Sequence, residues 1–460
     1  MPSGRNRLVS SKKIKRSVIV IGAGLSGLSA ALELQRMGLS VQVIEANNRV
    51  GGRIHSMQHF GSNREAGGTY IGAKYKMVIE FAKRNNIDLI DVSHMLSFFK
   101  EQDFALDNEI IIQKDWPSSK KNIFPEKFRN IMPWSLYRVL TKKYNPLNSA
   151  GEWLDKKNFI YDIPFDQWLK RKGFSEDQIK LVYGINVSYG LDAKDISTLL
   201  LLYRAAFSSD QKIIDDKVIG YTALNGVSAF TDAMSSQLEN EVHFKKNVLN
   251  INSGKDEAQI FCEDGSKYIA THVICSVPLS VLKGIIFTPT LPPKQYEAIN
   301  NIPYQPMTQI YFSYKSKFWE LDGYNPSLFT DSLAGMFSAS RDSKSPDEIT
   351  SFTSWVFGEN ANKLDKLQKK EAGELIIKTI ESLRPAIKGQ LEFIDLVSWG
   401  NEKFSKGAWA YYKPGQISKY FSIIGMSHNN IHFCGEHLAK ENRGMEGAME
   451  SGILTAKKLN

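Results

Sequence analysis

The chain of 460 residues contains only three cysteines and no long apolar run. Cys262, Cys275 and Cys434 are an odd number, show no metal-ligand or redox-pair spacing, and each lies in an apolar run typical of a strand. They predict reduced core residues in a cytoplasmic protein and exclude a disulfide scaffold. No window holds the roughly 18 consecutive apolar residues of a transmembrane helix, so we expect neither a membrane anchor nor, from the cysteines, a metal site.

Repeats and low-complexity linkers are also absent, and so is an apolar h-region of secretory length before Ser17. The basic head of the chain therefore indicates either a mitochondrial presequence or, as we prefer, a solvated tail. With 42% hydrophobic and 23% charged residues the composition is that of a globular protein, and the length favours two domains.

The net charge of +9 raises the question of a polyanionic partner, which depends on where the charge lies. Residues 1–16 hold six bases and no acid, and residues 113–143 hold eight bases and two acids. The remainder has 44 bases against 47 acids, so the body of the chain does not predict nucleic-acid binding. For 113–143 we prefer a solvated face beside a substrate entrance. A surface for a membrane or a redox partner is the other interpretation.

A nucleotide-binding pattern occupies the first fifty residues. The β-branched run 17–21 leads into Gly22-Ala-Gly24-Leu25-Ser26-Gly27, a helical segment follows, and a second apolar run, 40–44, ends in Glu45. The glycines permit a tight turn, approach of the backbone to a pyrophosphate and close helix packing, and Glu45 is suited to bind ribose hydroxyls. This pattern predicts a dinucleotide with an unphosphorylated ribose, and by itself it leaves NAD and FAD open.

Two neighbouring segments decide between them. Glu45-Ala46-Asn-Asn-Arg49-Val-Gly51-Gly52-Arg53 sets a glycine pair between arginines, and Glu65-Ala-Gly67-Gly68-Thr69-Tyr70-Ile71-Gly72 follows. In these segments the sequence resembles the flavin-containing amine oxidase family, and its monoamine oxidase-like branch in particular. The resemblance implies FAD as the cofactor, with the second segment lying against the flavin.

A third segment near the C-terminus resembles the second flavin motif of the same family. An apolar run ends at Gly435 and Glu436, and a small-residue helix is expected to start near Met445. The resemblance implies that Gly435 meets the pyrophosphate, that Glu436 accepts from a ribityl or phosphate-side group, and that the positive end of the helix faces the flavin.

The fold class that we expect is α/β, with a Rossmann-type FAD-binding domain interwoven with an α+β substrate domain. Periodicity predicts helices over 75–85, 163–172, 195–207 and 371–382, and strands over 242–244, 248–252, 259–262, 271–277, 308–314 and 351–357. Gly226 is expected to start a helix, and Asp264-Gly265 a hairpin turn. The expected boundaries are 1–78, 218–292 and 396–460 for the FAD-binding domain and 79–217 and 293–395 for the substrate domain.

The resemblance also implies an active site. It sets Trp409 as one wall of an aromatic cage before the flavin, Trp399 beside the ring, and Val248 at the adenine edge. The opposite wall falls at Gly444, so half of the cage is missing, which either opens the site to bulkier or secondary amines or leaves space for another aromatic residue. With Tyr70, these residues would place a neutral amine for hydride transfer to flavin N5.

Two departures from the family concern the flavin itself. Ala408 stands where monoamine oxidases carry a cysteine linked to flavin, so we expect non-covalent FAD. Gln309 stands where the family has a lysine that is water-linked to N5. Without that cation we expect slow reoxidation by oxygen and a carrier protein or a quinone as an alternative acceptor.

Several alternatives stay open at this point. An L-amino-acid oxidase needs an arginine for the substrate carboxylate; the segment Thr69-Tyr70-Ile71 lacks one, and Arg204 or Arg341 would have to substitute. Polyamine oxidases tend to carry a histidine near Ile71-Gly72, where this chain has none. From another class, the chain could be a flavin-binding protein with degenerate catalysis that acts through a partner. The oligomeric state, a homodimer included, is not decided by the sequence.

Overall fold

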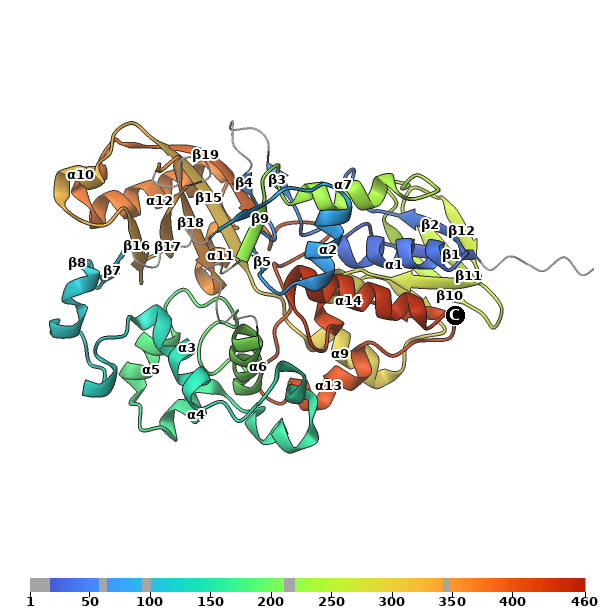
Figure 1. Cartoon of the computed structure of the whole chain (residues 1–460), viewed down its shortest axis with the longest axis horizontal. Coiled ribbons are helices and arrows are strands. Elements are labelled where there is room, and N and C mark those ends of the chain that lie inside the picture. The colour runs from blue at the N-terminus through green and yellow to red at the C-terminus, as the bar shows by residue number, and fades with distance from the viewer. Residues whose placement is uncertain (1–16, 58–63, 93–100, 211–219, 342–347, 460) are drawn as a thin grey trace, which may run out of the picture.

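The computed structural model describes residues 17–57, 64–92, 101–210, 220–341 and 348–459, so the basic segment 1–16 lies outside the described residues. Figure 1 shows a parallel sheet with helices α1 and α14 at one end of the molecule, a large, mostly antiparallel sheet at the other end, and a group of helices, α3 to α6, beside the latter. Every described helix is too short or too polar to cross a membrane.

The parallel sheet combines segments from three distant parts of the chain. Its strand order is β2-β1-β13-β20, with β1 at Ser17–Ile21, β2 at Ser40–Ile44, β13 at His272–Cys275 and β20 at Ile431–Phe433. All three pairings are parallel, and the β1 side chains from Val18 to Ile21 are buried, as expected for a strand covered on both faces. The Rossmann-type order strand–helix–strand predicted for residues 17–44 is therefore confirmed.

Helices α1 (Leu25–Arg36) and α14 (Gly444–Lys457) pack against each other next to this sheet. A Cβ at Gly452 would lie 2.1 Å from the Ser26 carbonyl oxygen, so only glycine allows the two helices to approach this closely. Helices α7 (Ser228–Ser236) and α2 (Lys76–Arg84) complete this end, α7 next to α1 and α2 next to α14. The first and last helices of the described chain thus form one unit.

A second, mostly antiparallel sheet continues this end of the molecule. Its order is β12-β11-β10-β14, with β10 at Val248–Ser253, β11 at Ala258–Cys262, β12 at Lys267–Ala270 and β14 at Ile286–Thr288. The hairpin turn predicted at Asp264-Gly265 is confirmed, since Gly265 has φ +83° between β11 and β12. The helices that follow β13 are α8 (Leu279–Leu282) and α9 (Pro293–Asn301).

The other end of the molecule is a seven-stranded sheet of order β19-β15-β18-β17-β16-β7-β8. Its strands are β7 at Gln102–Leu106, β8 at Glu109–Ile111, β15 at Met307–Tyr314, β16 at Ser327–Thr330, β17 at Met336–Ser340, β18 at Ser351–Phe357 and β19 at Leu391–Ser398. Helices α10 (Trp319–Asp322), α11 (Gly358–Leu364) and α12 (Lys369–Leu383) accompany it, and its apolar side chains form a separate core.

The helical group contains α3 (Pro133–Lys143), α4 (Phe165–Lys170), α5 (Glu176–Tyr183) and α6 (Thr198–Asp210), with α13 (Gln416–Ile424) nearer the parallel sheet. Short 3-10 helices fill the intervals at Gln113–Ser118, Glu126–Phe128, Ala150–Leu154, Lys156–Tyr161, Pro385–Ile387 and Glu436–Leu438. Small sheets join the two ends: β3 (Ser56–Met57) with β4 (Arg64–Glu65), and β5 (Ile71–Gly72) with β9 (Gly220–Ala223) and β6 (Leu89–Asp91).

The secondary structure differs from the prediction at several elements. The strand expected at 242–244 is reduced to one bridge, because only His243 pairs with the end of β2 before the chain turns to β10. Strands β12 and β14 were not predicted: each is short and lies at an edge of its sheet, where half of the residues face solvent and weaken the apolar alternation. The domain boundaries given above stay a prediction.

Candidate active site

One large cavity of about 740 Å³ runs from the turn after β1 to the aromatic residues near α6. It is lined by residues from the three glycine-containing segments, from the start of β10, from β15 and from the segment 399–409. The candidate residues that line it are Gly22, Gly24, Leu25, Ser26, Glu45, Ala46, Arg49, Gly52, Arg53, Gly67, Gly68, Thr69, Tyr70, Val248, Trp399, Trp409, Gly435, Glu436, Gly444 and Met445. Gly27 and Gln309 are the candidates that do not line it.

The turn after β1 needs glycine because of two close approaches. A Cβ at Gly27 would lie 2.0 Å from the Gly22 carbonyl oxygen, and one at Gly22, which has φ +101°, would lie 2.5 Å from the Ser276 hydroxyl. Gly27 therefore serves the packing of α1 onto the turn, as the motif predicts, and leaves the backbone of Gly24 free to face the cavity.

Glu45 is held in place by backbone donors. One of its carboxylate oxygens accepts from the Ala23 N–H at 2.7 Å, and the other accepts from the Asn47 N–H at 2.8 Å. Burial raises the pKa of this carboxyl, and the two N–H groups oppose that shift. The strand end, the turn and the carboxylate thus form one rigid edge of the cavity.

The two arginines around the glycine pair have different roles. Arg49 donates to the carbonyl oxygens of Val50, Gly52 and Ile54 at 2.8–3.0 Å, so it fixes the local loop. Arg53 donates to the Ala408 carbonyl oxygen at 3.0 Å and lies 3.6 Å from a Glu436 oxygen, so it joins three segments at the cavity. Our expectation that the arginines approach phosphates or the flavin ring is thus compatible with Arg53, whereas the Arg49 guanidinium already has several partners.

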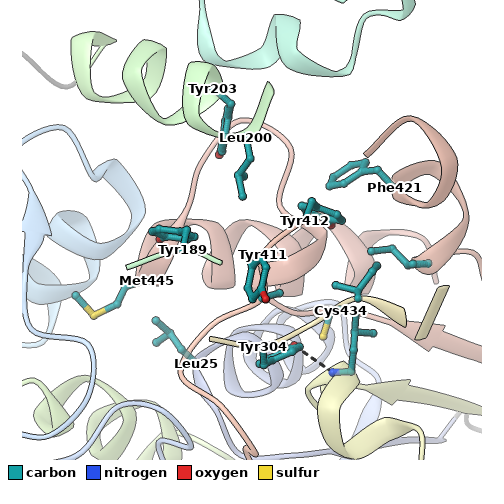
Figure 2. Packing of buried hydrophobic residues seen from close by; sticks show 14 of the residues in the cluster. Leu25, Tyr189, Leu200, Tyr203, Tyr304, Tyr411, Tyr412, Phe421, Cys434 and Met445 are labelled. Atoms are coloured by element: carbon teal, nitrogen blue, oxygen red, sulfur yellow. Dashed lines mark hydrogen bonds between the residues drawn. The ribbon is translucent and has the colours of Figure 1, made fainter. Parts of the chain in front are cut away.

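The C-terminal segment closes the same cavity. The Gly435 N–H donates to the Ser451 hydroxyl of α14 at 3.0 Å, and the next residue, Glu436, keeps a buried carboxylate oxygen without a hydrogen bond. His437 is buried beneath the Gly435 turn, and burial, aided by the positive charge of Arg53, lowers its pKa to about 3. Figure 2 shows Met445 of this segment beside Leu25 and Tyr189, which line the cavity from two other parts of the chain.

The middle segment, Gly67 to Tyr70, runs along the cavity. A Cβ at Gly67 would lie 2.0 Å from the Arg53 carbonyl oxygen, and one at Gly68 would lie 3.6 Å from Met445 Cγ. The indole N–H of Trp399 donates to the Ala66 carbonyl oxygen at 2.7 Å and so ties this segment to the residue after β19. Tyr70 keeps 44% of its surface exposed.

An aromatic wall forms the end of the cavity away from the glycine turns. The Trp409 ring lies 5.5 Å from that of Tyr189 and 6.0 Å from that of Phe357, and its indole N–H donates to the Ser188 carbonyl oxygen at 2.9 Å. The sequence pointed to Trp409 and missed Tyr189. No local pattern marks Tyr189, because it lies in an irregular segment between α5 and α6.

Opposite this wall the place of Gly444 is flanked by Tyr75. Gly444 has φ +58°, and a Cβ there would lie 3.4 Å from the Tyr75 hydroxyl oxygen. The Glu446 carboxylate holds Tyr75 nearby, since it accepts from the N–H groups of Met77 and Val78 at the start of α2. Another aromatic residue therefore lies next to the missing side chain, which is one of the two outcomes that the sequence left open.

Strand β15 carries Gln309, which stands where the family has a lysine water-linked to flavin N5. In this structure Gln309 does not line the cavity. Its side chain is fully buried. The side-chain oxygen Oε1 accepts from the Tyr311 hydroxyl at 2.7 Å, and the side-chain nitrogen Nε2 has no hydrogen-bond partner. Met307, two residues earlier on the same face of the strand, lines the cavity instead.

Arginines occur at the aromatic end as well. Arg204 of α6 and Arg443, which directly precedes α14, both line the cavity. Arg341, the other residue named as a substitute for a carboxylate-binding arginine, lies outside the lining and pairs with Glu101. Arg443 was missed because its neighbours in the sequence belong to the flavin motif and gave no reason to assign it to the substrate end.

Curated relatives cover nearly the whole chain. An L-amino-acid oxidase of Pseudechis australis is 23% identical over 478 residues, which span 99% of this chain and 89% of that protein. A flavin-containing amine oxidase of Oncorhynchus mykiss is 25% identical, over 96% of this chain and 85% of that protein. Wild-type putrescine oxidase bound to putrescine has a similar fold, with a TM-score of 0.75 and 21% identity over 96% of this chain and 98% of that one.

The family itself is identified by a match along almost the entire sequence. The sequence profile described as "Flavin containing amine oxidoreductase" matches residues 25–460, which include α1, the middle segment and α14. The three segments that meet at the cavity are therefore parts of one known pattern, and the chain belongs to the flavin-containing amine oxidoreductase family.

Proposed function

We propose that this protein uses FAD to oxidise a primary or secondary amine to the imine, which water hydrolyses to an aldehyde or a ketone. The observation that supports this most is the single cavity, which extends without interruption from the glycine turn at Gly24 to the aromatic wall at Trp409 and Tyr189. A cofactor held at one end would thus face a substrate held at the other.

The chain's own residues fit FAD. The tight turn at Gly22 lets the backbone approach the cofactor. Acceptors for the ribose and ribityl hydroxyls are offered by the Glu45 carboxylate and by the Glu436 oxygen that has no hydrogen bond. When bound, FAD accepts a hydride equivalent from the carbon that carries the amine. Arg53 would hold the middle of the cofactor, because it already joins the segments of Ala408 and Glu436.

At the aromatic end, Trp409, Tyr189 and Tyr75 would orient the amine and exclude water. Their rings are fixed by hydrogen bonds and by helix α2, so they form walls that need little rearrangement when a substrate enters. A desolvated site also favours the neutral amine, which is the form that can donate a hydride equivalent.

Non-covalent attachment of FAD is part of the proposal. Ala408 lines the cavity, and none of the three cysteines of the chain does so. Denatured protein should therefore show the mass of the bare polypeptide in intact mass spectrometry. A mass increased by that of the flavin would contradict this part.

For the electron acceptor, we propose that oxygen reoxidises the reduced enzyme slowly and that a carrier protein or a quinone is the physiological acceptor. The support is the apolar Met307 at the β15 face of the cavity, with the neutral Gln309 behind it, so this strand offers no cation near the reacting end. Stopped-flow reoxidation tests the point: a rate as fast as that of efficient oxidases would contradict it.

The experiment that tests the main proposal is anaerobic mixing of the holoenzyme with a panel of amines and amino acids. We expect at least one of them to bleach the absorption band of the flavin at about 450 nm. L-Amino acids are the second candidate class, because Arg204 lines the substrate end. If nothing in the panel reduces the flavin, a flavin-binding protein that acts through a partner becomes the better description.

A further inference from the structure

Two guanidinium groups share one aromatic ring at the substrate end of the cavity. The Arg204 guanidinium carbon lies 3.7 Å from the centre of the Tyr189 ring, and that of Arg443 lies 5.7 Å from it. Arg443 also donates to the Tyr189 hydroxyl, and the Tyr189 ring lies 5.5 Å from that of Trp409. The pair is thus attached to the wall where the amine would lie.

These two cations lack the acids that usually accompany buried arginines. Over the described ranges of the chain, neither Arg204 nor Arg443 has a carboxylate within 4 Å, and Nη1 of Arg204 is buried without a hydrogen-bond partner. Burial and the charge of Arg443 both lower the pKa of Arg204, which reflects the unfavourable pairing of like charges.

The acids of the cavity lining serve other arginines. Glu45 and Glu402 act on Arg49, and Glu436 has its ion pair with Arg53 at 3.6 Å. The flavin end is therefore balanced by its own residues. At the Tyr189 end two positive charges meet one lining acid, Glu436, which acts on Arg443 without an ion pair within 4 Å in the described ranges and already pairs with Arg53. A buried charge is normally paired, so a ligand is the natural source of the missing anion.

We propose that Arg204 and Arg443 together bind a carboxylate of the substrate, so that the preferred substrate is an amine that also carries a carboxylate group. This inference rests on the proposed function and narrows its substrate class. Tyr189 acts as a positioning residue, because it holds one guanidinium by stacking and the other by its hydroxyl.

The same geometry disfavours another class of amine. A diamine brings a second ammonium group, which the two guanidinium groups would repel in a site of low dielectric. The structurally similar putrescine oxidase binds putrescine, which is a diamine. We therefore expect the substrate preference of this protein to differ from that of putrescine oxidase. Charge at the Tyr189 end thus selects between substrates of similar length.

The first experiment compares amines that differ only in the carboxylate. Anaerobic flavin reduction is measured with L-phenylalanine against 2-phenylethylamine, and with 5-aminopentanoate against pentylamine and 1,5-diaminopentane. We expect a carboxylate-bearing member to reduce the flavin with a Kd at least about 10-fold below that of its partner, as for a charge-assisted hydrogen bond. Equal or tighter binding of 2-phenylethylamine and of pentylamine, each compared with its carboxylate-bearing counterpart, would overturn the inference but leave amine oxidation intact.

The second experiment does not depend on turnover. The flavin spectrum of the holoenzyme is titrated with 3-phenylpropanoate and with the neutral 3-phenylpropan-1-ol. We expect the acid to bind more tightly, and Arg204→Gln or Arg443→Gln to raise its Kd by about 10- to 100-fold. Arg204→Lys, which keeps the charge, should lose less, and Arg138→Gln, on helix α3 outside the cavity lining, should lose nothing.

The two readouts separate the possible failures. If 3-phenylpropanoate binds with the expected dependence on both arginines but no compound reduces the flavin, the anion site stands and the proposed function fails. If the acid does not perturb the flavin of the wild-type enzyme, or binds equally well to both Gln variants, the anion site is wrong whatever the enzyme oxidises.

Discussion

The two ends of the cavity are built in different ways. At the flavin end, part of the site is built within one continuous stretch of sequence: the glycine turn, Glu45 and the loop around Arg49 bond mainly to one another and to their own neighbours. At the substrate end, Tyr75, Tyr189, Arg204, Trp409 and Arg443 come from five separate segments. A cofactor site of this kind tolerates little variation where a glycine meets backbone, as at Gly27 and Gly67, whereas a wall of side chains can exchange members, as Gly444 and Tyr75 illustrate.

The largest effect is expected from a substitution in the glycine turn of the flavin end. Gly27→Val should abolish FAD binding and lower the free energy of unfolding by more than about 3 kcal/mol, because its Cβ would meet the Gly22 oxygen at 2.0 Å. Flavin content and urea unfolding measure both effects. Gly38→Ala is the control for a glycine in an open environment: Gly38 has φ +78°, so the substitution should cost only about 1–2 kcal/mol, with FAD retained. A flavin-loaded Gly27→Val protein would refute this description of the turn.

Trp409→Ala tests the other end. We expect normal FAD content but a fall in the rate of anaerobic flavin reduction of about 10- to 100-fold, because the amine loses the wall that orients it. Trp409→Phe should restore part of the rate. The difference between the ends would disappear if Trp409→Ala lost its flavin as well.

A third prediction concerns pH and belongs to the flavin end. In the folded protein the pKa of His437 is about 3, whereas an unfolded histidine has about 6.5. Between these values the unfolded chain binds the extra proton, so stability falls as pH falls, by about 1.4 kcal/mol per pH unit at most for this group. Free energies of unfolding in urea are measured for wild type and His437→Asn between about pH 4.5 and 7.5, a range that includes the pKa of an unfolded histidine. The variant should show a flatter dependence of this free energy on pH. Parallel profiles would mean that the pKa of His437 is not lowered in the fold.

The smallest effect is expected far from both ends. Lys114 and Lys120 are exposed members of the basic stretch 113–143. Reversing both, Lys114→Glu and Lys120→Glu, should change the free energy of unfolding by less than about 0.5 kcal/mol and leave turnover unchanged with oxygen and with an artificial acceptor. A loss with only one acceptor would indicate that this face binds a redox partner.

How much the sequence predicts follows the same division. Strand β1, the glycine turn and Glu45 were predicted because they belong to one continuous motif, in which the Glu45 carboxylate accepts from the Ala23 and Asn47 N–H groups. The alternation of side chains along β15 also predicts that Met307, Gln309 and Tyr311 share one face of the strand. It does not predict which of the three reaches the cavity, because that depends on where β15 crosses the Glu65–Gly67 segment. Arg443 and Tyr189 depend on contacts across hundreds of residues, for which a single sequence holds no signal.

The contact between α1 and α14 also sets an order in time. Strand β1 and helix α1 leave the ribosome long before α14, and the cavity that they begin is completed only by Gly435, Glu436 and the first turn of α14. At about 5–20 residues per second, roughly 20 to 80 s separate the two events. During that interval the face of α1 that later packs on Gly452 lacks its partner helix, so a part of the fold that is made before α14 is finished only with it.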